Sequence, residues 1–137
     1  MNILFDTNII LDVLLKREPH FKFSSALVAV VEQQVLVGWL GATTITTIYY
    51  LVEKETNRKT ANLAIKKILS LFNIASVSRV VLEEATELMF SDYEDAVLYQ
   101  SAVHTNLDGI VSRNKKDFVK AKLPIYSPEE LLLILDK

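Results

Sequence analysis

Residues 2–8 have the sequence NILFDTN, in which a short apolar run ends at Asp6 and is followed directly by Thr7 and Asn8. The apolar run 3–5 does not alternate with polar residues, which is typical of a strand that is covered on both faces. A carboxylate at the end of such a strand is costly to bury unless its charge is compensated. Because open α/β sheets bind ligands at the carboxyl ends of their strands, this segment predicts a functional acid at Asp6.

Strand candidates alternate with helix candidates along the rest of the chain. Strands are predicted at 2–6, 35–40, 74–77, 109–112 and 123–126, and helices at 9–15, before Gln33, at 43–55, 60–72, 81–89, 92–106 and after Ser127. Such alternation gives βαβ units, so we expect a mostly parallel central sheet with helices on both faces. The β-branched residues of 43–55 favour a strand, but its length favours the helix that we predict.

Three of the predicted helices begin with polar residues that can cap them. Thr60 is expected to cap one helix, and Ser91 with Glu94 has the spacing of a capping box at the start of another. Ser127 and Pro128 precede two acids, which is the favourable order of an N-cap, a proline at the first helical position and negative charge.

The composition indicates one folded domain over residues 1–137. Half of the residues are apolar and there is no cysteine, which excludes disulfides and thiolate metal sites. A chain of this length buries roughly two-thirds of its unfolded surface. No apolar stretch reaches the roughly 18 residues of a membrane span, and Asp6 and Asp12 break the apolar start that a secretory signal needs. We therefore expect a cytoplasmic protein without a membrane partner.

Charged residues are unevenly distributed, although the net charge is only −2. The chain has no lysine or arginine between Arg79 and Arg113, but it has acids there: Glu83, Glu84, Glu87, Asp92, Glu94, Asp95 and Asp108. Basic residues follow directly, among them Lys115 and Lys116. A carboxylate cluster can hold cations, and a neighbouring basic stretch can meet phosphates. Two oppositely charged solvated faces are the alternative interpretation.

Asp95 is the second candidate acid. In the predicted helix it shares a face with Leu98 and Ala102, and Asp92 lies one turn before it. Acids in a first helical turn also favour the helix dipole, which is a purely structural alternative. That alternative explains less well why an acid is aligned with an apolar face.

The loop after the predicted strand 109–112 carries the third candidate acid, Asp117. Ser112 and Asn114 lie on the same loop, at the edge where Asp6 is expected. The structural alternatives are that Asn114 and Asp117 each cap a short turn and that Asp6 caps the helix after it.

Taken together, these segments resemble the PIN domain, the ribonuclease fold of VapC-type toxins. The matching residues are FDTN at 5–8, Asp95-Ala96 with Ser101-Ala102 in the same helix, and IVSRN at 110–114 with KDF at 116–118. They span nearly the whole chain in the right order. The resemblance implies a three-layer α/β/α sandwich around the parallel sheet and an acidic pocket that holds Mg²⁺ or Mn²⁺.

The resemblance also assigns roles to residues. It implies that Asp6 and Asp95 are metal ligands and catalytic residues. The family's last acidic position falls near Asn114 and Asp117; Asn114 stands at the immediate position, so we choose Asp117 as the third ligand and catalytic residue. Thr47 departs from the family pattern, because it stands where the family has a Glu and brings no charge. The residues expected to support the site are Asn8, Thr47, Ser112, Asn114 and Asp92, and those expected to bind RNA are Arg113, Lys115 and Lys116.

We therefore expect a Mg²⁺- or Mn²⁺-dependent endoribonuclease that hydrolyses RNA phosphodiester bonds. The resemblance further implies the toxin of a toxin–antitoxin pair, with an antitoxin protein as partner and a homodimeric state. Because of Thr47, the alternative is a catalytically weakened PIN-like module that binds RNA or a partner protein. A phosphoryl-transfer enzyme with Asp6 as nucleophile is disfavoured, since Asn8 stands where its second acid is expected.

Overall fold

A five-stranded parallel sheet forms the centre of the structure, a computed structural model that describes residues 1–118 and 121–136. The strands lie in the order β3-β2-β1-β4-β5. Their bounds are β1 Asn2–Phe5, β2 Val37–Gly41, β3 Asn73–Ala75, β4 Gly109–Val111 and β5 Ile125–Tyr126. Each neighbouring pair is parallel, which confirms the predicted parallel sheet.

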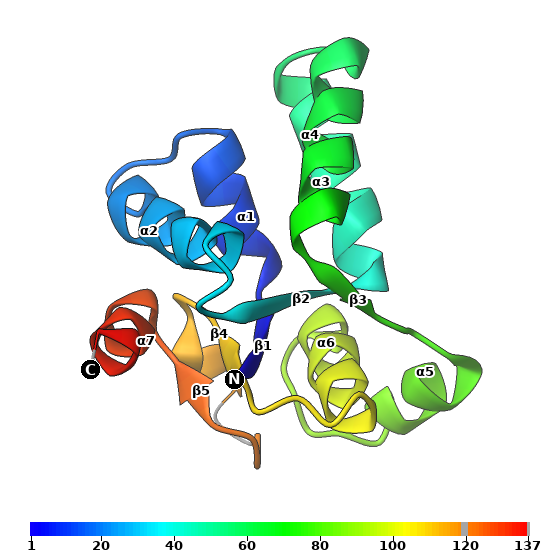
Figure 1. Cartoon of the computed structure of the whole chain (residues 1–137). Helices are drawn as coiled ribbons and strands as arrows, with labels where there is room; N and C mark the ends of the chain where they lie inside the picture. The colour runs from blue at the N-terminus through cyan, green and yellow to red at the C-terminus, as the bar shows by residue number, and fades with distance from the viewer. Residues whose placement is uncertain (119–120, 137) are drawn as a thin grey trace.

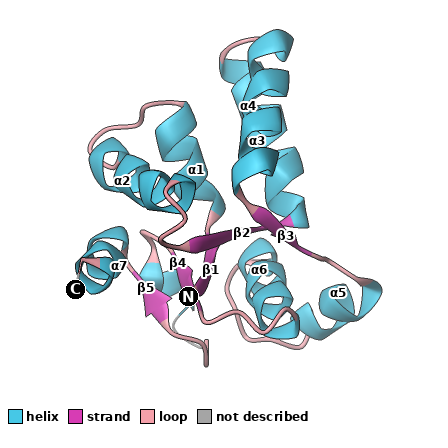
Figure 2. Ribbon diagram, in the orientation of Figure 1, coloured by secondary structure: helices cyan, strands magenta, loops and turns pink. Residues whose placement is uncertain are grey.

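Helices cover both faces of this sheet, as Figures 1 and 2 show. One face carries α1 (Thr7–Leu14), α2 (Phe21–Glu32), α3 (Ala42–Glu55), α4 (Arg58–Leu71) and α7 (Pro128–Leu135). The other face carries α5 (Arg79–Ala85), α6 (Tyr93–His104) and the short 3-10 helix η1 (Lys115–Phe118). The predicted α/β/α sandwich is thus confirmed. Within the described residues, no helix has the length and apolar character needed to cross a membrane.

Side chains of β1 alternate between the two helical layers. Ile3 and Phe5 pack into the core beneath α1–α4, whereas Leu4 packs with Leu98 and Ile110 beneath α6. Ile3, Leu4 and Phe5 are each 0% exposed. β1 is therefore covered on both faces, as its unbroken apolar run predicts.

The strand order reverses between β1 and β4. From β1 the chain moves outward through β2 and β3, and it returns later to form β4 and β5 on the opposite side. Phe5 is paired with Val111, and the Asp6 N–H donates to the Val111 carbonyl oxygen at 3.0 Å. Asp6 and Ser112 therefore leave the sheet side by side, at the point where such folds bind ligands.

Capping hydrogen bonds at two helix starts test the predicted caps. The prediction for Thr60 is wrong, because α4 is capped by Asn57, whose Oδ1 accepts the Thr60 N–H at 2.8 Å. An asparagine side chain is at least as good an N-cap as threonine, and here it comes three residues earlier. The predicted start of α7 is confirmed, since Ser127 and Glu130 form a capping box. The ambiguous segment 43–55 is helical.

The close approach of β5 to β4 requires a glycine at Gly109. A Cβ added there would lie 2.8 Å from the Pro124 carbonyl oxygen. That oxygen is held in place because it accepts the Ile110 N–H at 3.0 Å. We expect Gly109→Ala to lower the free energy of unfolding by about 1–3 kcal/mol, as overpacking does elsewhere. Urea denaturation measures the change, and an unaltered midpoint would show that β5 shifts without cost.

Candidate active site

An acidic cavity of about 270 Å³ lies at the carboxyl edge of the sheet. Its walls come from α1, α3, the start of α6, the residue directly after β1 and the segment after β4. It is lined by Asp6, Thr7, Asn8, Leu11, Thr47, Leu51, Asp92, Glu94, Asp95, Asn114 and Asp117. The three acids predicted to act together, which are far apart in the sequence, thus share one cavity.

Two larger hollows differ from this cavity in their chemistry. One, of about 460 Å³, lies between α2 and α7, and the other, of about 370 Å³, lies between α1, α2 and α4. Both are lined mostly by apolar side chains. Hydrolysis of a phosphodiester needs converging polar groups, so the smaller acidic cavity is the candidate active site despite its size.

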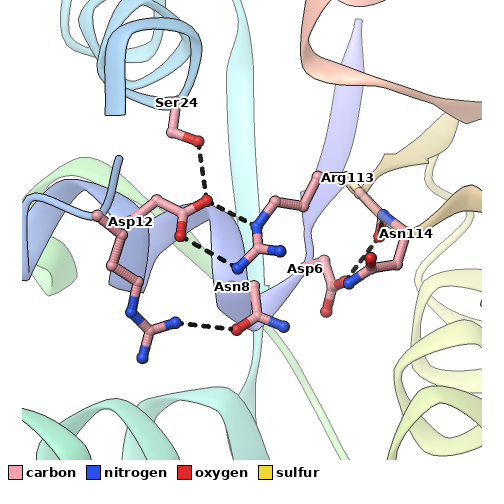
Figure 3. A network of polar contacts seen from close by, with 8 residues as sticks. Asp6, Asn8, Asp12, Ser24, Arg113 and Asn114 are labelled. Carbon is pink, nitrogen blue, oxygen red and sulfur yellow. Dashed lines mark hydrogen bonds and ion pairs between the residues drawn. The ribbon is translucent and has the colours of Figure 1, made fainter. Parts of the chain in front are cut away.

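Asp6 is fixed by Ser112 at the base of the cavity. The Ser112 Oγ donates to Asp6 Oδ2 at 2.7 Å and accepts the Asn114 N–H at 3.0 Å. Figure 3 shows Asp6 and Asn114 in this network of polar contacts. Asp6 occupies the N-cap position of α1, but its side chain accepts no capping hydrogen bond, so the predicted capping alternative is wrong. Burial raises the pKa of Asp6, against the opposing effect of the Ser112 hydrogen bond.

Asp95 experiences the combined field of the other acids. Burial, and then the negative charge of Asp6, raise the pKa of Asp95 to about 7, with smaller contributions from Asp92, Asp117 and Glu94. A shift with these causes requires that the carboxylates lie near one another in the folded chain. Perturbed carboxylates in a cleft are a physical mark of functional sites.

Glu94 is a cavity residue that sequence analysis missed. The predicted capping box of Ser91 with Glu94 is wrong, because α6 is capped by Asp92, whose Oδ1 accepts the Asp95 N–H at 3.2 Å. Glu94 is therefore not held by a capping box and lines the cavity instead. Burial, followed by the charges of Asp92 and Asp6, raises the pKa of Glu94. Aspartate and serine cap helices about equally well, so no local signal in the sequence distinguishes Asp92 from Ser91 as the cap.

Thr47 and Asn8 contribute neutral oxygen atoms to the cavity. The Thr47 Oγ1 donates to the Thr43 carbonyl oxygen at 3.2 Å, so its remaining capacity is as an acceptor. The Asn8 Oδ1 accepts a hydrogen bond from Arg17 Nη1 at 3.3 Å. Thr47 thus occupies the cavity, as its predicted supporting role requires, without bringing the charge of a glutamate.

The three cations predicted to bind RNA have different surroundings, and none lines the cavity within the described chain. The Arg113 guanidinium faces Asp12, with its Nε 2.9 Å from Asp12 Oδ2. Lys115 Nζ donates to Glu130 Oε1 at 2.8 Å, and Lys116 is exposed. Arg113 is therefore directed into the protein, while the RNA contacts of Lys115 and Lys116 stay predictions.

Oxygen atoms dominate the polar lining of the cavity, which suits a hard divalent cation. Among residues 1–118 and 121–136, no group of three or more His, Asp or Glu side chains is spaced closely enough to hold a metal ion as it stands. Two carboxylates 4 Å apart repel by roughly 4 kcal/mol at an effective dielectric constant of 20. Repulsion of this size opposes a closer approach of the carboxylates, and a bound cation would offset it.

The PIN-domain family matches residues 2–116 of the chain. The chain belongs to the PIN-domain family. Ribonuclease VapC1 of Aquifex aeolicus (strain VF5) is 27% identical over 133 residues, which cover 93% of this chain and 91% of that protein.

Solved structures share the PIN-domain architecture described above. VapBC2 from Rickettsia felis, bound to a promoter DNA fragment, matches with a TM-score of 0.69 and 17% identity, over 93% of this chain and 98% of that one. A toxin–antitoxin complex from Klebsiella pneumoniae matches with a TM-score of 0.66 and 22% identity, over 92% and 97%. At these identities the likeness is one of fold.

The raised pKa of Asp95 predicts how the stability of this PIN domain depends on pH without metal. Its pKa is about 7 in the folded chain against an ordinary value of 3.8. Between about pH 4 and 7 the folded chain binds a proton that the unfolded chain has lost, so stability falls as the pH rises. We expect Asp95→Asn to be about 1 kcal/mol more stable than the unaltered chain at about pH 8, after a discount for solvent screening.

Urea denaturation in the presence of a chelator measures this difference. It is expected to vanish below about pH 4, where both side chains are neutral. Lower stability of Asp95→Asn at about pH 8 would show that the carboxylates are not crowded in the folded chain.

Proposed function

We propose that this PIN domain is a Mg²⁺- or Mn²⁺-dependent endoribonuclease that hydrolyses 3′–5′ phosphodiester bonds in RNA. One observation carries the proposal: a single oxygen-lined cavity is shared by Asp6, Asp95 and Asp117. That cavity lies where the strand order reverses, which is the general ligand site of such sheets. The 27% identity to a protein named ribonuclease VapC1 supports the same activity.

Asp6, Asp95 and Asp117 are the proposed ligands of the cation. A divalent ion bound there supplies Lewis acidity toward the scissile phosphate and lowers the pKa of an attacking water. Ser112 orients the Asp6 carboxylate by binding one of its two oxygens. Asn114, which lines the same wall, is the proposed neutral contact to the substrate.

Lys115 and Lys116 are the proposed contacts to the RNA backbone. They belong to η1, the short helix that also carries Asp117. Cations at this position attract phosphates next to an acidic centre that would otherwise repel them.

Glu94 is proposed to replace the glutamate that the family pattern has at the position of Thr47. Both residues line the cavity, one from α6 and the other from α3. Burial, and then the negative charges of Asp92 and Asp6, raise the pKa of the Glu94 carboxyl, as its place among these acids requires. A fourth carboxylate therefore enters the site from a different helix than in the family pattern.

Substitution of Asp6 tests the proposed catalysis. Asp6→Asn keeps the acceptor for Ser112 and the shape of the side chain, but it removes the charge. We expect RNA cleavage to fall by roughly two orders of magnitude or more, since loss of one electrostatic stabiliser costs about 10²–10³ in rate. Cleavage of defined RNAs with Mg²⁺ and Mn²⁺ measures this, with circular dichroism as the control for folding. Undiminished cleavage by purified Asp6→Asn would remove Asp6 from the mechanism.

Substitution of Glu94 tests its role as an extra ligand. We expect Glu94→Gln to weaken Mn²⁺ binding by about 10-fold, because a hard cation loses one anionic oxygen. Calorimetric titration measures the affinity. Glu83→Gln is the matched control, since Glu83 is an exposed acid of α5 outside the cavity lining. Equal affinities of the two variants would show that Glu94 does not bind the ion.

Toxin–antitoxin biology is proposed from the relatives. The Klebsiella pneumoniae structure is described as a toxin–antitoxin complex, and the Rickettsia felis structure contains VapBC2. We infer that this chain is the toxin, that an antitoxin protein binds it, and that it acts as a cytoplasmic homodimer. Growth arrest on expression of the chain, absent for Asp6→Asn, is the expected sign of toxicity.

A non-catalytic binding module is the second candidate function. Thr47 favours it, because the site then lacks the charge that the family pattern supplies from α3. Calorimetry with Mn²⁺ separates the two candidates. The nuclease is expected to bind the ion, and its Asp95→Asn variant is expected to lose that binding. A non-catalytic binding module is expected to show no Mn²⁺ binding in either form.

A further inference from the structure

Asp12 is an acid of α1 that lies outside the cavity lining and is 0% exposed. A buried carboxylate is tolerated only when it is paired and hydrogen-bonded. Arg113 Nε donates to Asp12 Oδ2 at 2.9 Å, and Arg113 Nη2 donates to Oδ1 at 3.3 Å. The Ser24 Oγ lies 3.4 Å from Oδ2 (Figure 3). The ion pair thus joins α1 to the segment that follows β4.

The position of Arg113 in the chain connects this ion pair to the active site. Arg113 lies between Ser112, which donates to Asp6, and Asn114, which lines the cavity. A planar guanidinium with two donors on one carboxylate fixes the orientation of the side chain as well as its distance. Two acids at the start and middle of α1, Asp6 and Asp12, therefore bind consecutive residues of the same segment.

We propose that Asp12 is a positioning residue, which acts through Arg113 to hold Ser112 and Asn114 in place at the active site. This inference rests on the proposed ribonuclease function. Second-layer partners of metal ligands typically change metal affinity or activity by about 10–100-fold when removed. Ser112 is such a partner of Asp6, and Asp12 acts one step beyond it, through Arg113.

Two other roles are possible for the same ion pair, and they predict different results. A purely structural pair stabilises the packing of α1 but leaves the cavity unaffected. A direct RNA contact by Arg113 changes KM, because it contributes to substrate binding, and leaves metal affinity unchanged. Positioning changes metal affinity and kcat and leaves KM nearly constant.

The first experiment uses Asp12→Asn, which keeps the shape of the side chain and one acceptor for Arg113. We expect Mn²⁺ affinity and kcat to fall by about 10–100-fold, with KM changed less than about 2-fold. Amide hydrogen exchange gives a readout that needs neither metal nor RNA. Exchange of the Asn114 N–H, which donates to Ser112 Oγ, is expected to accelerate by about 10-fold, while the Ile110 N–H within β4 stays protected.

A double variant separates positioning from stability. Replacement of a buried ion pair by apolar side chains of similar volume commonly restores or increases stability. Asp12→Leu combined with Arg113→Met is therefore expected to regain the unfolding midpoint of the unaltered chain without regaining Mn²⁺ affinity or kcat. Recovery of all three would show that the pair only stabilises the fold, and would overturn the inference.

Two control variants leave the ion pair between Asp12 and Arg113 intact. Ser24→Ala removes the longer contact to Asp12 and leaves Arg113 in place. Glu130→Gln removes the exposed partner of Lys115 but retains a side chain that can form the capping box with Ser127. Both are expected to change affinity and kcat by less than about 2-fold, as exposed or weak polar contacts do.

The outcomes distinguish this inference from the function on which it rests. If the unaltered chain neither binds Mn²⁺ nor cleaves RNA, the proposed function fails, and the inference fails with it. If the unaltered chain cleaves RNA and Asp12→Asn cleaves equally well, only the positioning role of Asp12 is overturned. A change confined to KM would likewise overturn positioning, in favour of an RNA contact by Arg113.

Discussion

The parallel pairing of β1 with β4 is the constraint on which the rest of the site depends. It places Phe5 opposite Val111, so that the next residues, Asp6 and Ser112, leave the sheet together and form a 2.7 Å hydrogen bond. The two strands are separated by more than a hundred residues, so the contact between Asp6 and Ser112 exists only in the folded chain. Because Asp6 directly follows a strand that is packed on both faces, and its N–H donates to Val111, its position is set by the sheet and the core rather than by a loop. Rigid elements hold functional groups more accurately than loops do.

The negative charges gathered in the site lower the stability of the folded chain. Burial and mutual repulsion raise the pKa of Asp6, Asp95 and Glu94, which means that their charged forms oppose folding at neutral pH. Hydrogen bonds from Ser112 to Asp6 and from the Asp95 N–H to Asp92 offset part of this cost. The remainder is carried by the two apolar layers on either side of the sheet. A cation that binds the folded chain alone would stabilise it further by mass action.

The sequence predicted the strands and the shared position of the acids for a physical reason. Unbroken apolar runs indicate buried strands, and parallel strands end at the same edge of the sheet. Asp6 and Asp117 were therefore expected to lie close together. Glu94 was missed because the helix start was placed one residue too early. Successive residues of an α-helix are rotated by about 100° about the helix axis. A shift of one residue in the predicted helix start therefore changes the expected role of Glu94 from capping the helix to lining the cavity. Asp12 was missed because its partner, Arg113, is 101 residues away and no local pattern encodes the contact.

The basic residues after β4 have the same charge but different partners in the fold. Read along the chain, Arg113, Lys115 and Lys116 form a single cationic run. In the fold, the first is directed into the protein against buried Asp12, the second pairs at the surface with Glu130, and the third is exposed. The division follows side-chain chemistry, because a guanidinium is weakly hydrated and binds a carboxylate at two points, whereas an ammonium keeps its water. An arginine at this place is therefore not interchangeable with a lysine, although both would give the sequence the same charge.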